Sequence, residues 1–173
     1  MNAAEFKQIM IPCGKKLYNF ARFLLGDDAE AEDAVQETYL KLWKMKDELN
    51  DVKNPEAFAM RIIRNWCLDK LRAKNHVLRE NLPAINDHNI SSNPYRMTEV
   101  ADALEKFRFL LDRLPEQQKM ILHLRDIQNY EFNEIAEITG MSINNIRVNL
   151  SRARSALRDS LTKLNRYGTE RSK

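Results

Sequence analysis

Apolar residues recur at spacings of three and four along most of the chain, which is the pattern of amphipathic helices. In the first 25 residues this apolar face consists of Phe6, Ile9, Cys13, Leu17, Phe20 and Leu24. Pro12 interrupts the pattern and predicts a kink or a restart, because proline lacks the backbone N–H that a helix interior needs. Gly26 predicts the end of this segment, since glycine readily adopts the left-handed conformation that closes a helix.

Two capping signals predict where the next helices begin. Asp27, with Glu30 three residues later, is expected to act as N-cap and capping partner. Asn54, Pro55 and Glu56 predict a second start: Asn caps, Pro suits the first helical position, and Glu meets the positive end of the helix dipole. The apolar face of the first of these helices carries Val35, Tyr39 and Leu42, and that of the second carries Phe58, Ile62 and Trp66.

The periodicity fades over residues 76–98, where Pro83 and Pro94 stand among polar side chains. It resumes with Val100, Leu104, Phe107, Leu110, Leu111 and Leu114, and Leu114-Pro115-Glu116 predicts another helix start, followed by Met120, Ile121 and Leu124. The sequence thus predicts an all-α fold of two small helical domains, residues 1–75 and 99–173, joined by a flexible linker over residues 76–98.

The last third of the chain has the pattern of a helix-turn-helix. Ile135, Ala136 and Ile138 predict a short helix, Gly140 a turn, and Ser142 the N-cap of a long final helix. One face of that helix is expected to pack inward through Ile146, Leu150, Ala153, Leu157, Leu161 and Leu164.

The opposite side of the final helix is basic, since residues 141–173 contain eight Lys and Arg against two Asp and Glu. Arginines supply phosphate contacts and exposed polar or small apolar side chains reach base edges, so this face predicts DNA binding in the major groove. Asn149 is expected on the same exposed surface. The candidate contacts are Asn144, Asn145, Arg147, Val148, Ser151, Arg152, Arg154 and Arg158.

Two further charged segments lie in the first domain. Residues 61–79 carry six Lys and Arg against the single Asp69, which predicts a second nucleic-acid surface. The helix that starts at Asp27 is acidic instead, which favours a protein partner; its carboxylates are Asp27, Asp28, Glu30, Glu32, Asp33 and Glu37. Two basic surfaces and one acidic surface suit a factor that bridges a protein to two places on DNA.

Composition excludes several other classes. Only 4 Gly and 5 Pro argue against a sheet-rich fold, and 43% hydrophobic with 31% charged residues is ordinary for a globular protein. Without a long apolar run or a leader pattern, we expect a cytoplasmic protein with no membrane insertion. Cys13 and Cys67 are isolated and expected to be buried, and the three histidines are scattered, so we expect no metal, cofactor, catalytic residue or small-molecule substrate.

Three ordered motifs resemble the extracytoplasmic-function sigma factors of bacterial RNA polymerase. Ala31 to Trp43 is similar to the segment that binds the clamp helices of the largest polymerase subunit. Phe58 to Arg72 is similar to the segment that melts and reads the minus-10 promoter element, and Leu114-Pro115-Glu116-Gln117-Gln118, Glu134-Ile135-Ala136 and Leu150-Ser151-Arg152-Ala153-Arg154 are similar to the minus-35 domain. The resemblance covers nearly the whole chain.

This resemblance implies a non-enzymatic subunit that joins core RNA polymerase, selects promoters and helps to open the duplex. It assigns core binding to Glu32, Asp33, Gln36, Glu37 and Leu40, and minus-10 DNA to Asn54, Arg61, Arg64, Asn65, Lys70 and Arg72. The family's pocket for a flipped base falls at residues 51–57 together with Asn65. The minus-35 element is assigned to the exposed face of the final helix, and an anti-sigma factor is implied as a further partner.

Two positions depart from the family pattern, and two other functions remain open. Asn144-Asn145 stands where many members have Gly-Thr, and Glu131 stands where a Ser commonly caps. A helix-turn-helix regulator that is not a polymerase subunit would explain the C-terminal domain, although not the acidic face. A small magnesium nuclease would need a second converging carboxylate motif. Trp43 and Trp66 are expected to be core residues.

Overall fold

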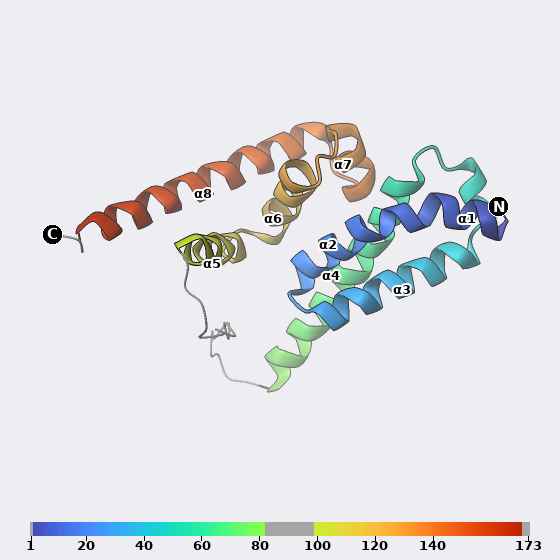
Figure 1. Ribbon diagram of the computed structural model, residues 1–173, viewed down its shortest axis with the longest axis horizontal. Coiled ribbons are helices and arrows are strands. Elements are labelled where there is room, and N and C mark those ends of the chain that lie inside the picture. Colours follow the sequence, from blue (N-terminus) through green and yellow to red (C-terminus); the bar gives the residue numbers. More distant parts are fainter. Residues whose placement is uncertain (1, 82–98, 171–173) are drawn as a thin grey trace.

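The computed structural model describes residues 2–81 and 99–170, with side chains placed for residues 2–77 and 105–163. Within these ranges the chain is helical with no β-strand, so the all-α prediction is confirmed (Figure 1). The expected linker residues 82–98 and the contacts of Arg79, Val100, Leu104 and Leu164 lie outside this description. The elements are α1 (Ala3–Met10), η1 (Ile11–Cys13), α2 (Gly14–Leu25), α3 (Asp28–Lys44), η2 (Glu48–Asp51), α4 (Pro55–Asn81), α5 (Glu99–Asp112), α6 (Glu116–Leu122), η3 (His123–Ile127), α7 (Phe132–Thr139) and α8 (Ile143–Glu170).

The first helical segment is divided at Pro12, as predicted. A 3₁₀ turn containing Pro12 separates α1 from α2, and Gly26 ends α2 in the left-handed conformation with φ 75°. Phe6, Cys13, Leu17, Phe20 and Leu24 are buried, whereas the expected apolar contact at Ile9 is wrong because its side chain is 38% exposed and Met10 is buried in its place.

Both predicted N-caps are confirmed. The carboxylate of Asp27 accepts from the backbone N–H of Glu30 at 2.8 Å, and Asn54 Oδ1 accepts from the N–H of Ala57 at 3.0 Å. The predicted role of Glu30 as capping partner is wrong, because its carboxylate pairs with Lys74 of α4 at 3.3 Å instead, which links the start of α3 to α4. Helix α4 continues to Asn81, beyond residue 75.

The inward face of α4 differs from the prediction. Ala57, Met60, Ile63 and Cys67 are fully buried. The predicted residues Phe58, Ile62 and Trp66 lie one position away and are only partly buried at the edge of the core. Because these large apolar side chains lie directly beside the buried stripe, the apolar face of the sequence is wider than the face that is fully buried.

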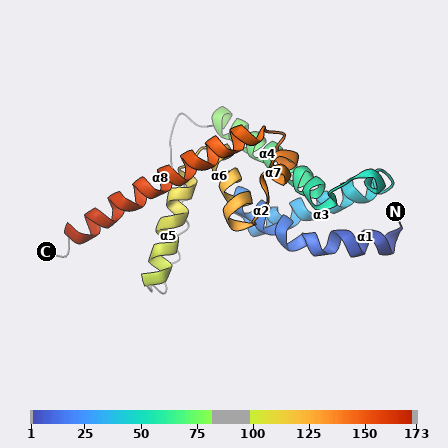
Figure 2. The same ribbon diagram turned by 90° about the horizontal axis from the view of Figure 1, so that it is seen from above.

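The helix-turn-helix is confirmed in α7 and α8. Gly140 follows α7 with φ 73°, and Ser142 Oγ accepts from the N–H of Asn145 at 3.3 Å. Ile146, Leu150, Ala153 and Leu157 of α8 are buried, but Leu161 is 39% exposed, so the inward face ends earlier than its periodicity predicted. Figures 1 and 2 show why: the C-terminal part of α8 projects beyond the other helices.

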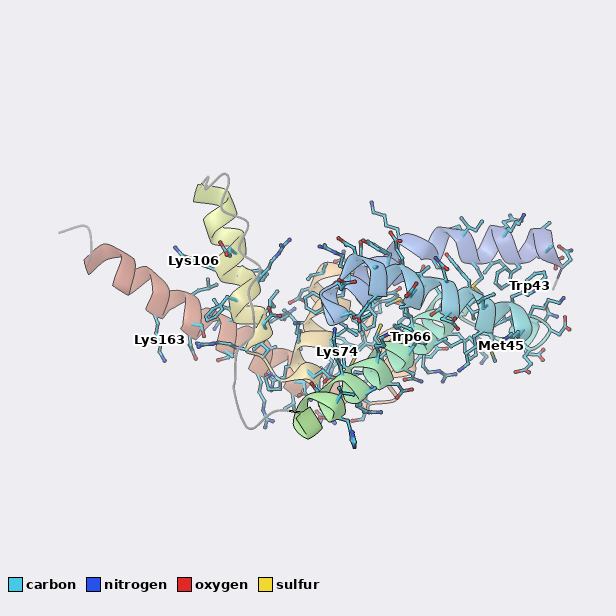
Figure 3. The ribbon with its side chains drawn as sticks, turned by 90° about the horizontal axis from the view of Figure 1, so that it is seen from below. Trp43, Met45, Trp66, Lys74, Lys106 and Lys163 are labelled. Atoms are coloured by element: carbon cyan, nitrogen blue, oxygen red, sulfur yellow. The ribbon has the colours of Figure 1, made fainter. Side chains whose placement is uncertain are left out.

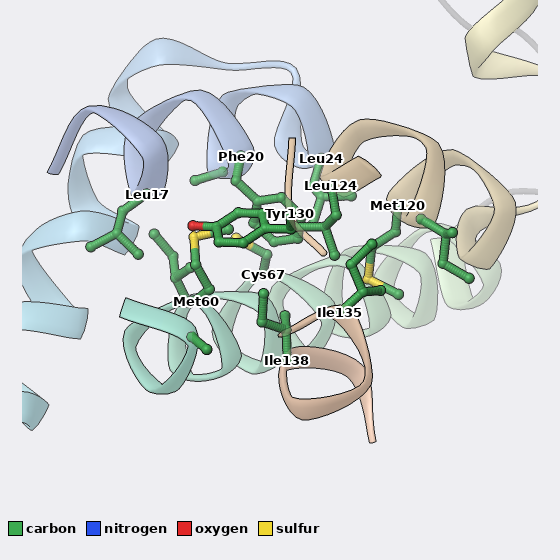
Figure 4. Packing of buried hydrophobic residues seen from close by; sticks show 14 of the residues in the cluster. Leu17, Phe20, Leu24, Met60, Cys67, Met120, Leu124, Tyr130, Ile135 and Ile138 are labelled. Carbon is green, nitrogen blue, oxygen red and sulfur yellow. The ribbon is translucent and has the colours of Figure 1, made fainter. Parts of the chain in front are cut away.

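The N-terminal helices α1–α4 and the C-terminal helices α5–α8 share one continuous hydrophobic core. Helix α7 packs on α4, and Tyr130 enters between α2 and α4 (Figure 4). In Figure 4 the side chains of Leu124, Ile135 and Ile138 lie beside Phe20, Met60 and Cys67. The two halves, predicted as separate domains, therefore pack against each other.

Trp43 is not the core residue that the sequence predicted. It is 39% exposed, with its ring edge-on to Phe6 at a centroid distance of 5.2 Å and Lys46 Nζ 4.5 Å from the ring centroid. Trp66 is partly buried against the core, with Lys70 Nζ 5.4 Å from its ring centroid.

Candidate nucleic-acid and partner interfaces

An acidic face runs along the outer side of α3. The buried residues of α3 are Ala31, Ala34, Thr38 and Leu42. Their spacings of three and four place them on one side of the helix, which faces the core. The five residues that the sequence assigns to partner binding are consequently all exposed: Glu32, Asp33, Gln36, Glu37 and Leu40. Leu40 is 54% exposed, so this surface combines three carboxylates with one large apolar side chain. Such a composition fits a basic protein surface with an apolar pocket.

The outer face of α8 is polar and basic. All eight residues predicted to contact DNA there are exposed: Asn144, Asn145, Arg147, Val148, Ser151, Arg152, Arg154 and Arg158. An open groove of about 430 Å³ follows this face, with Phe132 of α7 on its other side. Three arginines line it, namely Arg147, Arg154 and Arg158, so the groove favours an anionic ligand.

Two of these arginines have protein partners. Arg147 lies over the Phe132 ring at 5.1 Å, and Arg125 lies over the same ring at 4.7 Å. Arg154 donates two hydrogen bonds to the carboxylate of Asp126, at 3.0 and 2.5 Å, and this pairing raises its pKa. Arg154 is therefore partly neutralised, whereas no protein carboxylate within the described part of the chain forms an ion pair with Arg152.

Asn149 does not lie on the exposed face, contrary to the sequence prediction. Its side chain is 9% exposed, and its Nδ2 donates to the backbone oxygen of Asn145 at 2.9 Å and to Asn145 Oδ1 at 3.1 Å. Asn145 is exposed one turn earlier. Asn149 therefore fixes the Asn145 side chain instead of reaching DNA itself; the i, i+4 spacing of the two asparagines is the sequence signal of this contact.

The basic surface of α4 remains largely open. Arg61, Asn65, Lys70 and Arg72 are exposed, and Arg61 lies over the Phe58 ring at 5.0 Å. Figure 3 shows the row of side chains on α4 between the labelled Trp66 and Lys74. Cations next to partly exposed aromatic rings are suited to a nucleic-acid single strand, whose bases stack and whose phosphates need counter-charges.

Two residues assigned to this nucleic-acid surface contact the C-terminal half. Asn54 Nδ2 donates to Glu134 Oε1 of α7 at 3.2 Å, and Arg64 Nε donates to the Met120 sulfur at 3.3 Å. Arg64 is half-buried, and its desolvation lowers its pKa. Of the six residues predicted to contact minus-10 DNA, four are thus exposed and two contact the C-terminal half.

Sequence reasoning missed the polar centre of this contact, at Glu56. The Glu56 carboxylate accepts from Tyr130 Oη at 2.6 Å and pairs with Lys16 Nζ at 2.5 Å. Tyr130 is 2% exposed. Its pKa is raised mainly by this burial and, second, by its hydrogen bond to Glu56. These partners come from α2, α4 and the segment before α7, and no local motif predicts such a long-range cluster.

Neither thiol has the properties of a reactive cysteine. Cys13 and Cys67 are free and buried, as predicted, and burial raises the pKa of Cys67 to about 12. Across the described ranges no group of three His, Cys, Asp or Glu is arranged to hold a metal ion. In the same ranges no helix is both long and apolar enough to span a membrane.

Each half of the chain matches a known protein family. The Sigma-70 region 2 family matches residues 12–77, and the Sigma-70 region 4 family matches residues 104–157, so the two matches together cover more than half of the chain. The chain belongs to the sigma-70 family of RNA polymerase sigma factors, and its similarities fall in the extracytoplasmic-function group.

Curated relatives are similar over most of the chain. It is 29% identical to the sigma factor EcfG of Rhodopseudomonas palustris, over 80% of this chain and 75% of the relative. It is 27% identical to SigV of Bacillus subtilis, over 91% of this chain and 93% of the relative. It is also 27% identical to SigE of Mycolicibacterium smegmatis over 86% of this chain, but this match spans only 58% of that relative's length.

Two solved structures are similar in fold over most of the chain. The sigma factor RpoE of Bartonella quintana, solved in complex with the anti-sigma factor NepR, superposes with a TM-score of 0.74 at 26% identity, covering 91% of this chain and 97% of RpoE. CnrH, solved in complex with the cytosolic domain of CnrY, has a TM-score of 0.70 at 21% identity and covers 94% of this chain, which shows a common fold.

Proposed function

We propose that this chain acts as an alternative sigma factor that binds core RNA polymerase, directs it to particular promoters and helps to open the DNA. The observation that carries this proposal is the combination of three exposed surfaces on one chain of this family. They are the acidic face of α3, the cationic face of α4 and the basic outer face of α8. A regulator that only binds DNA needs the last of these alone.

Each surface has a physical role in this proposal. The α3 residues Glu32, Asp33, Gln36, Glu37 and Leu40 contact the clamp helices of the largest polymerase subunit. The α8 face docks in the major groove at the minus-35 element, where arginines contact phosphates and Asn145 and Arg147 reach base edges. The α4 surface then holds the unpaired minus-10 strand, whose phosphates and flipped base offset the cost of unstacking.

The chain contributes binding and positioning, and the polymerase carries out the chemistry. Its proposed division is residues 1–75 for core and minus-10 binding, 76–98 as a linker, and 99–173 for minus-35 binding. It acts in the cytoplasm, where the polymerase and the promoter are. An anti-sigma factor is a further proposed partner, supported by the similarity to RpoE, which was solved bound to one.

Run-off transcription tests this function directly. Core polymerase with a randomised promoter library should give promoter-specific transcripts only when the chain is added. A helix-turn-helix regulator would instead bind duplex DNA and leave core polymerase inactive on every promoter of the library. The absence of chain-dependent transcripts, with binding to duplex DNA retained, would therefore replace the proposed function by that alternative.

A further inference from the structure

Phe132, the first residue of α7, has two arginines over its ring. The guanidinium carbon of Arg125 lies 4.7 Å from the ring centroid, and that of Arg147 lies 5.1 Å from it. Phe132 and Arg147 also line the open groove along α8 together. This aromatic side chain therefore connects a residue of η3 with a residue on the basic outer face of α8.

Several contacts fix the position of the Phe132 ring. The ring is partly buried and packs against the hydrophobic core. Arg125 donates to the Tyr130 oxygen at 2.7 Å and pairs with Glu131 at 3.2 Å, which ties this guanidinium to the chain just before α7. The Glu131 N–H donates to Glu134 Oε2 at 2.8 Å and so anchors the first turn of the helix. The ring thus offers α8 a fixed aromatic face.

Arg147 depends on this face for its orientation. Its side chain is exposed, and no carboxylate in the described part of the chain pairs with it, in contrast to Arg154, which Asp126 holds. A restrained arginine loses less rotamer freedom when it binds than a mobile one. Unlike an ion pair, a cation–π contact restrains the guanidinium without supplying a hydrogen-bond acceptor. Arg147 therefore keeps its donors for another partner.

We propose that Phe132 determines specificity on the minus-35 surface, as a positioning residue that directs Arg147 at a base edge. This proposal rests on the proposed function. An arginine reads guanine best through two parallel hydrogen bonds to O6 and N7, and this pairing depends on the direction of the guanidinium plane. Loss of the aromatic face should therefore reduce the preference for one base pair more than it reduces overall affinity.

Three substitutions separate the role of the aromatic face from that of apolar volume. Phe132→Leu removes the face and keeps an apolar side chain at the edge of the core. Phe132→Tyr keeps the face and is the rescue variant. Phe109→Leu is the matched control, because Phe109 is exposed on α5, has Arg113 over its ring at 4.6 Å and does not line the groove. Thermal unfolding verifies that each variant is folded.

Binding of the full chain to a library of minus-35 duplexes measures base preference and affinity separately. We expect Phe132→Leu to lose about threefold in discrimination at the base pair that Arg147→Ala affects, while Phe132→Tyr and Phe109→Leu match the wild type. The double variant Phe132→Leu/Arg147→Ala should discriminate no worse than Arg147→Ala alone. A uniform loss of affinity, a loss at another base pair or additive losses would each overturn the positioning role.

Nuclear magnetic resonance tests the same contact in the wild-type chain. The Nε–Hε signal of Arg147, assigned by its absence in Arg147→Ala, should carry an upfield shift from the ring current of Phe132. This shift should persist when the preferred duplex of the library is added. If it disappears on DNA, Arg147 leaves the ring in order to bind, and the proposal is wrong.

Run-off transcription distinguishes a failure of this proposal from a failure of the proposed function. Base reading that depends on Phe132, without chain-dependent transcripts, would keep the positioning role and refute only the activity as a sigma factor. Chain-dependent transcripts with the same promoter preference for wild type and Phe132→Leu would keep the sigma activity and refute the positioning role.

Discussion

Asn149 Nδ2 lies 3.1 Å from Asn145 Oδ1 and also donates to the Asn145 backbone oxygen, so a buried amide orients an exposed one on the outer face of α8. With its oxygen engaged, Asn145 presents its Nδ2 donors toward solvent. Acceptors in the major groove, such as N7 and O6 of guanine or O4 of thymine, fit this orientation. Within the proposed function, Asn149 is a positioning residue for sequence reading.

Replacing Asn149 with Ala should change promoter choice, although Asn149 itself makes no contact with DNA in this proposal. We expect Asn149→Ala and Asn145→Ala to weaken discrimination at the same base pair of the minus-35 element, by about threefold to tenfold. The measurement is binding to a library of duplexes. If Asn149 acts through Asn145, the double variant will discriminate no worse than Asn145→Ala alone; additive losses would contradict this coupling.

Replacing Arg147 with Ala should alter the preference of the chain for particular bases in the minus-35 element. Arg147 is exposed near the start of α8 and is oriented over the Phe132 ring. A base reader loses discrimination at particular positions, whereas a phosphate contact loses affinity for every sequence by the same factor. Binding across the same duplex library distinguishes the two, and a uniform loss would assign Arg147 to the DNA backbone.

Arg152 and Arg154 should differ in their contribution to DNA affinity, although both are exposed on α8. Asp126 already pairs with Arg154, so Arg154→Ala should reduce the salt dependence of binding less than Arg152→Ala. For a full phosphate contact, the slope of log affinity against log salt falls by about 0.9. In contrast, Asp126→Ala should free Arg154 and strengthen binding. Equal slopes for the two Arg variants would show that the ion pair opens on DNA.

Charge reversal on α3 should weaken binding to core polymerase. The triple variant Glu32→Lys, Asp33→Lys and Glu37→Lys changes only exposed residues, so we expect the helical signal and the thermal midpoint to stay near those of the wild type. Reversal of Glu48 and Glu137, exposed elsewhere, is the control. Surface plasmon resonance against immobilised core polymerase measures the loss, and unchanged affinity of the triple variant would refute the assignment of α3.

His123 should make the fold sensitive to mild acid. Its ring is 3% exposed, and its centroid lies 4.2 Å from that of the Phe23 ring. Its pKa is lowered from 6.5 to about 4, mainly by burial and, second, by the positive charge of Lys119. Its contribution to stability is complete above pH 6.5 and is lost as the pH falls from 6.5 toward 4. From these values the loss between pH 8 and pH 5 is about 2 kcal/mol.

Urea unfolding at the two pH values measures this effect. His123→Phe removes the titrating ring, so its acid loss should be smaller than that of the wild-type chain by about 2 kcal/mol. His76→Gln is the control, because His76 is exposed on α4. Equal acid losses for the wild type and His123→Phe would mean that other groups account for the pH dependence.

Local signals were predicted well because they act over one helical turn. Asp27, Asn54 and Ser142 cap their helices, and Gly26 and Gly140 adopt the left-handed conformation, as residue type alone indicated. The family motifs added the order of the three surfaces. Errors arose at the edges of apolar faces, as at Ile9, Trp43 and Leu161, where periodicity continues beyond the elements available to pack against it.

The closure of the two halves could not be predicted from periodicity. Its polar contacts join residues that are far apart in the sequence, such as Lys16 with Gln128 and Glu56 with Tyr130. Asn149 was assigned to the wrong side because polar character suggested exposure, whereas its position between Ile146 and Leu150 leaves it at the border of the core. Only a hydrogen-bonding partner one turn away makes burial of that amide favourable.

The core shared by the two halves has a consequence for how long the free chain survives. Ile135 and Ile138 of α7 are fully buried beside α4, so separating the halves brings them into contact with water unless another surface takes over. A partner that separates the halves must therefore cover Ile135 and Ile138 itself or leave α7 exposed to water. Protease susceptibility at α7 would then report how much of the chain is engaged by a partner at any moment.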